Sequence, residues 1–520
     1  MVRSPLLQEV TSLEGRRFVV VSNRQPFSHV RRDGEVRVEK PPSGLTLALE
    51  PIVQATRGTW IAASSGDADR EFVDRRGHVL QNPPDVQYKL RRLFLPAKLN
   101  EDFYTGFANS ALWPLCHIAY HKPRFEEHWW RAYVRANELF AEAVADEIGD
   151  RPAIVFIQDF QLALLPRLLR QRCPRALIAQ FWHIPWPNPE AFRICPWRKE
   201  LLEGLLGNHL LGFHLPYHCN NFLYTVDREL QARLDRERNR VVLEERATAV
   251  AAFPLSVDFR RIRESVLGAE AQREAARLRE LHGRGRKLVL SVERLDYSKG
   301  ILERIEAIQR LFERYPALRE TVSFVQIATP SRTTVRAYRD YAAAVERAVA
   351  RVNANLAGNG WTPIKPMHTY LEPEKVWIWY NAADALIVSS LHDGMNLVSK
   401  EYVAAAPDDG VLLLSEFTGA ARDLDEAVSI NPYATDGFAD AIAMSLSMPE
   451  SERRERMRRL RWRVSNYDVG AWARDILRVI RQHDFDAHRP APVGGLAEGQ
   501  FPSRGLAAEA GWRPARARRH

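Results

Sequence analysis

Cysteine is scarce in this chain of 520 residues. The four cysteines are scattered, with no CxxC pair, at Cys116, Cys173, Cys195 and Cys219. A disulfide framework or a structural zinc site needs closely spaced, paired ligands. His209, His214 and His218 lie near one of these cysteines, but they straddle a predicted strand and helix, and no second ligand pair accompanies them. We therefore expect reduced thiols and no metal site.

Long apolar runs are also missing. No stretch approaches the ~20 apolar residues that a membrane helix needs. The first residues contain no apolar segment of signal-peptide length. We therefore expect a cytoplasmic protein without a membrane partner.

Charge of one sign is present only in modest excess. The formal net charge is +9, of which +4 comes from six arginines and two glutamates after residue 487. The remainder is spread over a long chain, which predicts no nucleic-acid partner but suits an enzyme whose ligands carry phosphate. Residues 487–520 are rich in Pro, Gly, Ala and Arg without periodicity, which predicts a disordered basic tail.

Apolar runs of strand length are frequent, and helix-like segments separate them. These runs are nearly continuous in Val, Ile, Leu or Phe, which indicates strands buried on both faces of a parallel sheet. The alternation of strands and helices predicts an α/β fold. The expected strands cover residues 18–22, 154–158, 177–182, 210–213, 287–292, 323–327, 385–389 and 411–415.

The expected strands form two groups, one ending before residue 256 and the other beginning at residue 287. We predict two doubly wound, Rossmann-like domains that face each other across a cleft. They cover residues 16–260 and 261–486, after an N-terminal extension at 1–15, and the last helix is expected to pack back on the first domain. Ligands of such sheets lie beyond the carboxyl ends of the strands.

The strand at 287–292 is followed by the segment ERLDYSKG, residues 293–300. Arg294 and Lys299 can converge on one anion here. A diphosphate fits, because the charge of a leaving group must be neutralised as a glycosidic bond breaks. A solvated loop is the alternative.

The strand at 385–389 is followed by a second charged segment. Gly394 permits a tight turn into a helix, whose first N–H groups form an anion site. Glu401 could hold ribose hydroxyls two turns further on, and Asp393 could hold a sugar hydroxyl. Capping of the helix by Asp393 is the alternative.

Three further strand ends carry single candidates. His183 follows the strand at 177–182 and precedes a rigid proline run. Arg332 follows the strand at 323–327 and is a candidate ligand for an acceptor phosphate. Arg24 follows the strand at 18–22, and Gly44 is expected in a loop beyond it.

Together these segments resemble the trehalose-6-phosphate synthases, the retaining glycosyltransferase family 20. ERLDYSKG and DGMNLVSKEY (residues 393–402) are the most specific matches, and the resemblance covers about residues 17–480. The other matching stretches are Ser22-Asn23-Arg24, Phe103-Tyr104, Asn109 to Pro114, Asp159, His183-Ile184-Pro185, Pro330-Ser331-Arg332, Trp361-Thr362-Pro363, Glu416 to Ala420 and Asn431-Pro432-Tyr433.

The resemblance implies a GT-B fold without a metal requirement and assigns roles to residues. The implied catalytic residues are Arg294, Lys299, Asp393 and His183, of which the first two would bind the donor diphosphate and the last two the transferring glucose. The other implied donor ligands are Gly44, Leu371, Leu397, Val398, Ser399, Lys400 and Glu401. The implied acceptor site consists of Arg24, Tyr104, Trp113, Asp159 and Arg332.

The implied reaction moves glucose, with retention, from a nucleotide-glucose to glucose 6-phosphate, and UDP-glucose is the foremost donor. No carboxylate pair of the glycosidase kind is required. The sequence carries no DxDx[TV] phosphatase motif, so a separate phosphatase would act on the product. A homo-oligomer is possible.

Several positions depart from the family pattern. Gln158-Asp159-Phe160-Gln161 stands where His-Asp-Tyr-His is usual, Ser43 where Gly is usual, Ala63 where Trp is usual and His392 where Arg is usual. These changes leave the acceptor pocket and the donor base open.

Three other functions compete with this one. A glucosylglycerol-phosphate synthase is the nearest, but that family lacks the arginine that matches Arg332. A pseudo-glycosyltransferase departs at the Glu-Arg-Leu-Asp-Tyr segment, which is intact at residues 293–297. A non-catalytic sensor would be expected to lose Arg294, Lys299, Asp393 or Glu401, and all four are present.

Overall fold

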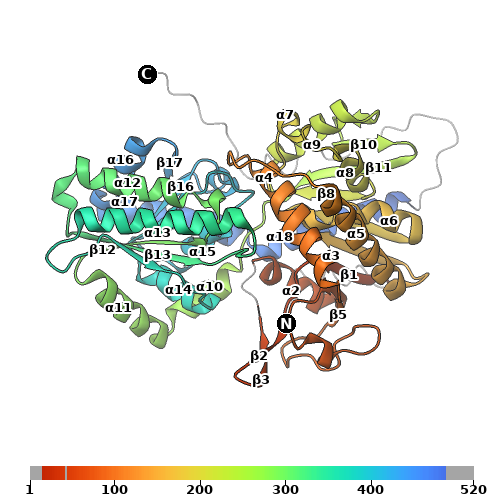
Figure 1. The fold of residues 1–520 in the computed structure, drawn as a ribbon, viewed down its shortest axis with the longest axis horizontal. Coiled ribbons are helices and arrows are strands. Elements are labelled where there is room, and N and C mark those ends of the chain that lie inside the picture. The colour runs from red at the N-terminus through yellow and green to blue at the C-terminus, as the bar shows by residue number, and fades with distance from the viewer. Residues whose placement is uncertain (1–14, 41–43, 488–520) are drawn as a thin grey trace.

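Two β-sheets, built mainly from parallel strands, lie side by side in the computed structural model (Figure 1). The structure describes residues 15–40 and 44–487. The expected tail at 488–520 and residues 1–14 of the expected extension therefore lie outside the described residues, whereas Ala487 is the last residue of a helix. The predicted α/β fold is confirmed. All eight expected strands are present, with ends shifted by no more than two residues.

The first sheet has nine strands within the described residues, and its order is β5-β4-β1-β6-β7-β8-β11-β10-β9. Neighbours are parallel from β5 to β11, and β10 and β9 extend the edge antiparallel. The strands are β1 (Arg17–Ser22), β4 (Thr59–Ala63), β5 (Lys89–Leu93), β6 (Ala153–Gln158), β7 (Ala176–Phe181), β8 (Leu210–Phe213), β9 (Arg233–Asp235), β10 (Arg240–Leu243) and β11 (Arg246–Ala252). A separate hairpin pairs β2 (Ser28–Arg32) with β3 (Glu35–Glu39).

The second sheet has six strands in the described part of the chain, all parallel, in the order β14-β13-β12-β15-β16-β17. They are β12 (Lys287–Arg294), β13 (Val322–Thr329), β14 (Ile364–Met367), β15 (Ala385–Val388), β16 (Val411–Ser415) and β17 (Val428–Ile430). Both sheets reverse their strand order next to the first strand, which is where doubly wound folds open a crevice for ligands.

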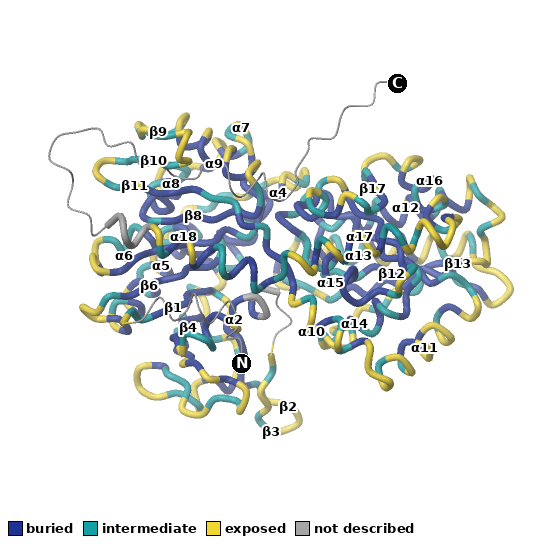
Figure 2. Tube along the Cα trace, turned by 180° about the vertical axis from the view of Figure 1, so that it is seen from behind, coloured by how far each residue is buried: buried dark blue, intermediate teal, exposed yellow. Residues whose placement is uncertain are grey.

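Helices cover both faces of each sheet, and the strands form a buried centre (Figure 2). In β1, Val20 packs with Leu49 of α2 on one face, while Val19 packs with Phe140 of α5 on the other. Alternate residues of a strand face opposite ways, so an unbroken apolar run is needed to fill both layers. The main helices on the first sheet are α2 (Gly44–Thr56), α5 (Glu127–Ile148), α6 (Leu165–Arg172), α8 (Arg198–Leu205) and α9 (Pro216–Glu229).

The second sheet is covered in the same way. Leu288 of β12 belongs to one apolar layer and the next residue, Val289, to the other. Its helices are α10 (Phe259–Leu267), α11 (Ala269–Gly283), α12 (Ile301–Arg314), α13 (Arg336–Leu356), α14 (Pro373–Ala382), α15 (Leu397–Ala405), α16 (Thr435–Ser447) and α17 (Glu450–Asn466).

Helix α18 (Val469–Ala487) follows the second sheet in sequence but lies with the first domain (Figure 1). Its Trp472 is fully buried and meets Phe181 of β7 edge-to-face, with ring centroids 5.4 Å apart. Phe156 of β6 lies at 6.4 Å from the same indole. Burial of this indole ties the two domains together.

Short helices connect the first domain to the cleft. They are α3 (Ala97–Asn100), η2 (Glu101–Leu112), α4 (Trp113–His117), η3 (Phe160–Leu162) and α7 (Pro189–Phe192). Helix η2 is a π-helix, and its Asn109 and Ser110 donate side-chain hydrogen bonds to the carbonyls five residues earlier. π-Turns are frequent at functional sites, and this one carries Tyr104.

Candidate active site

A cavity of about 720 Å³ lies between the domains, at the carboxyl ends of the strands. This volume suits a small-molecule ligand. Most of the predicted site residues line it. From the first domain they are Arg24, Tyr104, Trp113, Asp159 and His183, and from the second they are Arg294, Lys299, Arg332, Leu371, Asp393, Leu397, Val398 and Glu401.

Three predicted residues are not among the described lining residues. Gly44, expected in a loop, is the first residue of helix α2. The backbone N–H of Ser399 donates to Asn396 Oδ1 at 3.1 Å. Lys400 is buried, and its ammonium donates to the Leu255 carbonyl at 3.0 Å and to Asp423 at 2.9 Å. The Lys400 side chain is therefore engaged in joining the domains.

Two arginines gather around one tryptophan of the cavity. The guanidinium carbon of Arg332 lies 3.9 Å from the centroid of the Trp113 ring, and that of Arg294 lies 5.4 Å from it. Arg24 Nη2 donates to the Tyr104 hydroxyl at 3.3 Å. Burial raises the pKa of Tyr104, but Arg24 and Arg332 act against burial and bring that pKa down to about 7. The cluster thus concentrates positive charge, to which an anion could bind.

Arg332 is prepared for a ligand. Its φ is 48°, a left-handed value that costs a non-glycine residue free energy and occurs at functional sites. Its Nε is buried without a hydrogen-bond partner among the described residues. A buried donor without a partner is costly, and an anion in the cavity would satisfy it.

One buried carboxylate holds two of these arginines. Asp296 is fully buried, and its Oδ2 lies 3.2 Å from Arg332 Nη1 and 3.6 Å from Arg294 Nη2. Its Oδ1 accepts from the backbone and hydroxyl of Ser298, at 3.0 and 2.9 Å. Burial raises the pKa of Asp296, and Arg332 and Arg294 outweigh burial, so the pKa lies below its usual range. The sequence placed Asp296 in a motif, but only the fold brings Arg332 to it.

A lysine–carboxylate pair lines the cavity. Lys299 is the last residue of the short helix η4 (Tyr297–Lys299), which begins directly after Asp296, and its Nζ donates to Asp393 Oδ2 at 2.5 Å. Burial alone would raise the pKa of Asp393, but Lys299 holds it well below its usual range. Asp393 does not cap helix α15, because Asn396 accepts from the first turn instead. The capping alternative is therefore wrong.

The turn after β15 is shaped by contact with the first domain. A Cβ on Gly394 would lie 2.6 Å from the carbonyl oxygen of His183. The left-handed residue of this turn is Asn396, with φ of 81°. Gly394 is thus required for the close approach of the two domains, rather than for the tight turn that the sequence suggested.

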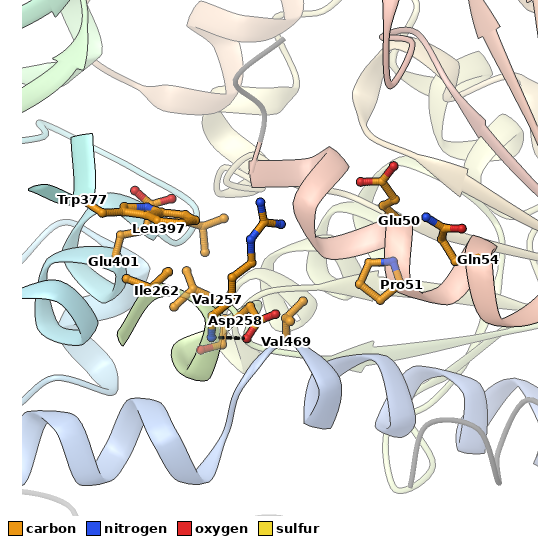
Figure 3. A pocket seen from close by; sticks show the side chains of 12 residues that line it. Glu50, Pro51, Gln54, Val257, Asp258, Ile262, Trp377, Leu397, Glu401 and Val469 are labelled. Atoms are coloured by element: carbon orange, nitrogen blue, oxygen red, sulfur yellow. Dashed lines mark hydrogen bonds between the residues drawn. The ribbon is translucent and has the colours of Figure 1, made fainter. Parts of the chain in front are cut away.

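Glu401 is a buried carboxyl group of the cavity wall. Its Oε2 accepts from the Tyr380 hydroxyl at 3.4 Å, and burial raises its pKa to about 7. Glu401 and Leu397 also line a second cavity of about 180 Å³ at the seam between α2 and α10 (Figure 3). Glu50, Pro51 and Gln54 of α2 face the second domain across this cavity (Figure 3).

Clustered metal ligands are absent from residues 15–40 and 44–487. Within these residues, no three His, Cys, Asp or Glu side chains come together as a metal site would require. No helix in the same ranges is both long and apolar enough to span a bilayer. The four cysteines are buried and unpaired.

Comparison with known proteins assigns the chain to a family. The model of glycosyltransferase family 20 matches residues 16–482. The trehalose-6-phosphate synthase of Mycobacterium sp. (strain JLS) is 39% identical over 473 residues, covering 89% of this chain and 96% of that protein. That of Mycolicibacterium smegmatis is 39% identical over 477 residues, covering 89% and 92%.

Solved structures give the same result. The α,α-trehalose-phosphate synthase (UDP-forming) of Burkholderia xenovorans, in complex with glucose-6-phosphate, is 30% identical with a TM-score of 0.81, covering 89% of this chain and all of that one. A structure from E. coli bound with UDP-2-fluoro glucose is 29% identical with a TM-score of 0.80, covering 90% and 99%. The expected GT-B fold is confirmed by these neighbours. The chain belongs to glycosyltransferase family 20.

Proposed function

We propose that this enzyme transfers glucose from UDP-glucose to glucose 6-phosphate, giving α,α-trehalose 6-phosphate and UDP. The observation that supports this most directly is the convergence of Arg294, Lys299 and Glu401 with Arg24 and Arg332 on one cavity. Such a cavity offers cations to a donor diphosphate and to an acceptor phosphate at the same time. The name of the Burkholderia xenovorans enzyme, UDP-forming, favours UDP as the nucleotide.

The donor half runs from Glu401 to Lys299. Glu401 would accept the ribose hydroxyls, Leu371 would contact the base, and the first N–H groups of α15 at Leu397 and Val398 would face the diphosphate. Arg294 and Lys299 would neutralise it. Gly44, Ser399 and Lys400 would act only through backbone contacts, because the Lys400 ammonium is already bound.

The acceptor half lies on the other side of the arginine cluster. Arg24 and Arg332 would bind the phosphate, with the buried Nε of Arg332 as one donor. Tyr104, Asp159 and Trp113 would hold the sugar. Burial raises the pKa of Asp159 to about 6, so near neutral pH this carboxyl is mostly ionised and would accept hydrogen bonds from the sugar hydroxyls.

The proposed mechanism is front-face substitution with retention. The bond between the anomeric carbon and the UDP oxygen breaks, and the acceptor hydroxyl attacks from the same face. The departing phosphate oxygen takes the proton of that hydroxyl, so atoms and charges balance without a protein base. Arg294 and Lys299 stabilise the charge that develops on the leaving group, and His183 and Asp393 orient the glucose. The contact between Lys299 and Asp393 supports this division of roles, because it would bring the cation for the leaving group next to the ligand of the sugar.

Three further properties stay predictions: a cytoplasmic location, a separate phosphatase for the product, and a homo-oligomer. So does the domain boundary at residue 260, which falls in helix α10 between the last strand of the first sheet and the first strand of the second.

Product formation tests the proposed function. Purified protein would be incubated with UDP-, GDP- or ADP-glucose and with glucose 6-phosphate or glycerol 3-phosphate, and release of the nucleoside diphosphate would be measured. We expect the highest turnover with UDP-glucose and glucose 6-phosphate. A preference for glycerol 3-phosphate would contradict the acceptor assignment, and binding of UDP-glucose without turnover would point to a sensor.

A further inference from the structure

A buried amide holds the imidazole that faces the cavity. Gln158 is the last residue of β6 and is fully buried. Its Oε1 lies 3.0 Å from Nε2 of His183, which follows the neighbouring parallel strand β7. This is one of the positions where the chain departs from the family pattern, in which histidine is usual.

The orientation of the Gln158 amide follows from its other neighbour. Gln158 Nε2 lies 3.4 Å from the backbone carbonyl oxygen of Phe156. A carbonyl oxygen only accepts hydrogen bonds, so the amide NH₂ faces Phe156 and the amide oxygen faces His183. Since an amide oxygen also only accepts, the hydrogen between the two side chains belongs to His183 Nε2. The neutral ring then keeps a free lone pair on Nδ1.

The surroundings of His183 keep the ring uncharged. Burial lowers the pKa of His183 to about 3. The carboxylate of Asp159 accepts from the His183 backbone N–H at 3.1 Å, and the described contacts show no carboxylate bonded to the ring. His214 contacts the His183 carbonyl at 3.1 Å. Asp393 and Lys400, from the second domain, oppose each other in their effect on the pKa of His214.

The described residues give Nδ1 of His183 no hydrogen bond, and the side chain lines the main cavity. We propose that Gln158 is a positioning residue that fixes His183 as the neutral Nε2–H tautomer, so that Nδ1 accepts a hydrogen bond from a hydroxyl of the transferred sugar. The second half of this inference rests on the proposed function. A histidine at position 158 could ionise or exchange tautomers, whereas a glutamine can do neither. This enzyme should therefore lack a titration of this pair at neutral pH.

The tautomer can be measured without any substrate. The full chain would be labelled with ¹⁵N-histidine, the His183 signals assigned with His183→Asn, and both ring nitrogens followed by NMR from pH 6 to 8. We expect a protonated Nε2 and an unprotonated Nδ1 over the whole range. A protonated Nδ1 in the wild-type protein would overturn the inference.

Two substitutions of Gln158 separate positioning from packing. Gln158→Met removes the acceptor, so both tautomers should appear and turnover should fall roughly threefold to tenfold, the scale of one neutral hydrogen bond. Gln158→Glu keeps an acceptor but adds a charge that favours the imidazolium, which donates from both nitrogens. Its turnover should be lowest at acid pH and recover as the pH rises, a limb that the wild-type profile lacks.

Gln161→Glu is the matched control. It adds the same charge to the same cavity, with no hydrogen bond from its side chain to His183 among the described contacts, so it should show no such limb. A flat profile for Gln158→Glu, or an equal limb in Gln161→Glu, would refute the positioning role. If the wild-type enzyme shows no glucosyl transfer, the proposed function fails, and the NMR measurement still decides the role of Gln158.

Discussion

Replacing Asp296 by Asn should leave Arg332 and Arg294 without their carboxylate partner and should therefore destabilise the protein. The carboxylate is fully buried and faces two guanidinium groups, those of Arg332 at 3.2 Å and Arg294 at 3.6 Å. Removing one partner of a buried ion pair costs about 3–5 kcal/mol. Asparagine retains one oxygen as an acceptor and Trp113 still covers both arginines, so we expect the lower end, about 3 kcal/mol of unfolding free energy.

Inorganic phosphate should reverse much of this loss. An anion in the cavity replaces the missing charge, and a ligand present at 100 times its Kd stabilises a protein by about 2.7 kcal/mol. Urea unfolding would be followed by tryptophan fluorescence, with and without phosphate at constant ionic strength. We expect phosphate to stabilise Asp296→Asn more than it stabilises the wild-type protein.

Asp69→Asn is the control for this experiment. Asp69 and Arg92 form a fully buried pair at 3.1 Å, and neither residue is among the described lining residues of the cavity. Its substitution should also destabilise the protein, but phosphate should add no more than it adds to the wild type. The reasoning would fail if Asp296→Asn unfolded like the wild type, or if phosphate rescued both variants equally.

Three further outcomes follow from the same contacts. Arg294→Ala should cut turnover by ~10²-fold or more in a coupled UDP-release assay, the scale for losing one transition-state charge partner. Arg260→Ala, which removes a side chain that is 86% exposed, should not lower turnover. Near-normal turnover of Arg294→Ala would exclude the leaving-group role. Burial raises the pKa of Glu401 from 4.5 to about 7, so the unfolding free energy of the wild type should fall as the pH rises from 4.5 to 7. That of Glu401→Gln should not fall in this way, so the difference between the two proteins should change over this window and stay constant above it. A constant difference throughout would contradict the burial argument. Trp472→Ala should lower the unfolding free energy, measured by urea unfolding, by about 3–5 kcal/mol, because it leaves a cavity where the indole of α18 contacts Phe181. A loss under about 1 kcal/mol would mean that the packing of the helix does not depend on this contact.

The interior strands were predictable because each must fill two apolar layers. Residues 18–21 and 411–414 are apolar without a break, and both lie in interior parallel strands. The strand β5, with the sequence KLRRL, was not predicted. It lies at the sheet edge, where one side has no strand neighbour, and Arg91 and Arg92 are buried there by ion pairs with distant acids. Ion pairs of that kind leave no periodic pattern in the sequence.

The candidate site likewise contains residues that local sequence could nominate and contacts that only the fold could show. ERLDYSKG and the segment at 393–402 each place their residues at one strand end, so local sequence was enough to nominate Arg294, Lys299 and Glu401. The sequence could not show that Asp296 joins Arg294 to Arg332, because the partners come from two strands. Nor could it show that Lys400 turns away from the cavity to bind Leu255 of the first domain.

By itself, the sequence determined the α/β class, the two groups of strands, and the family resemblance, because strand burial and the ligands of a strand end are encoded by consecutive residues. Only the tertiary structure decided which side chains and backbone groups meet at the site. Gly394 is required by the His183 carbonyl of the other domain, and the tautomer of His183 depends on Gln158. These contacts join residues that are not neighbours in the chain, and their free energies depend on burial and distance, which exist only once the chain has folded.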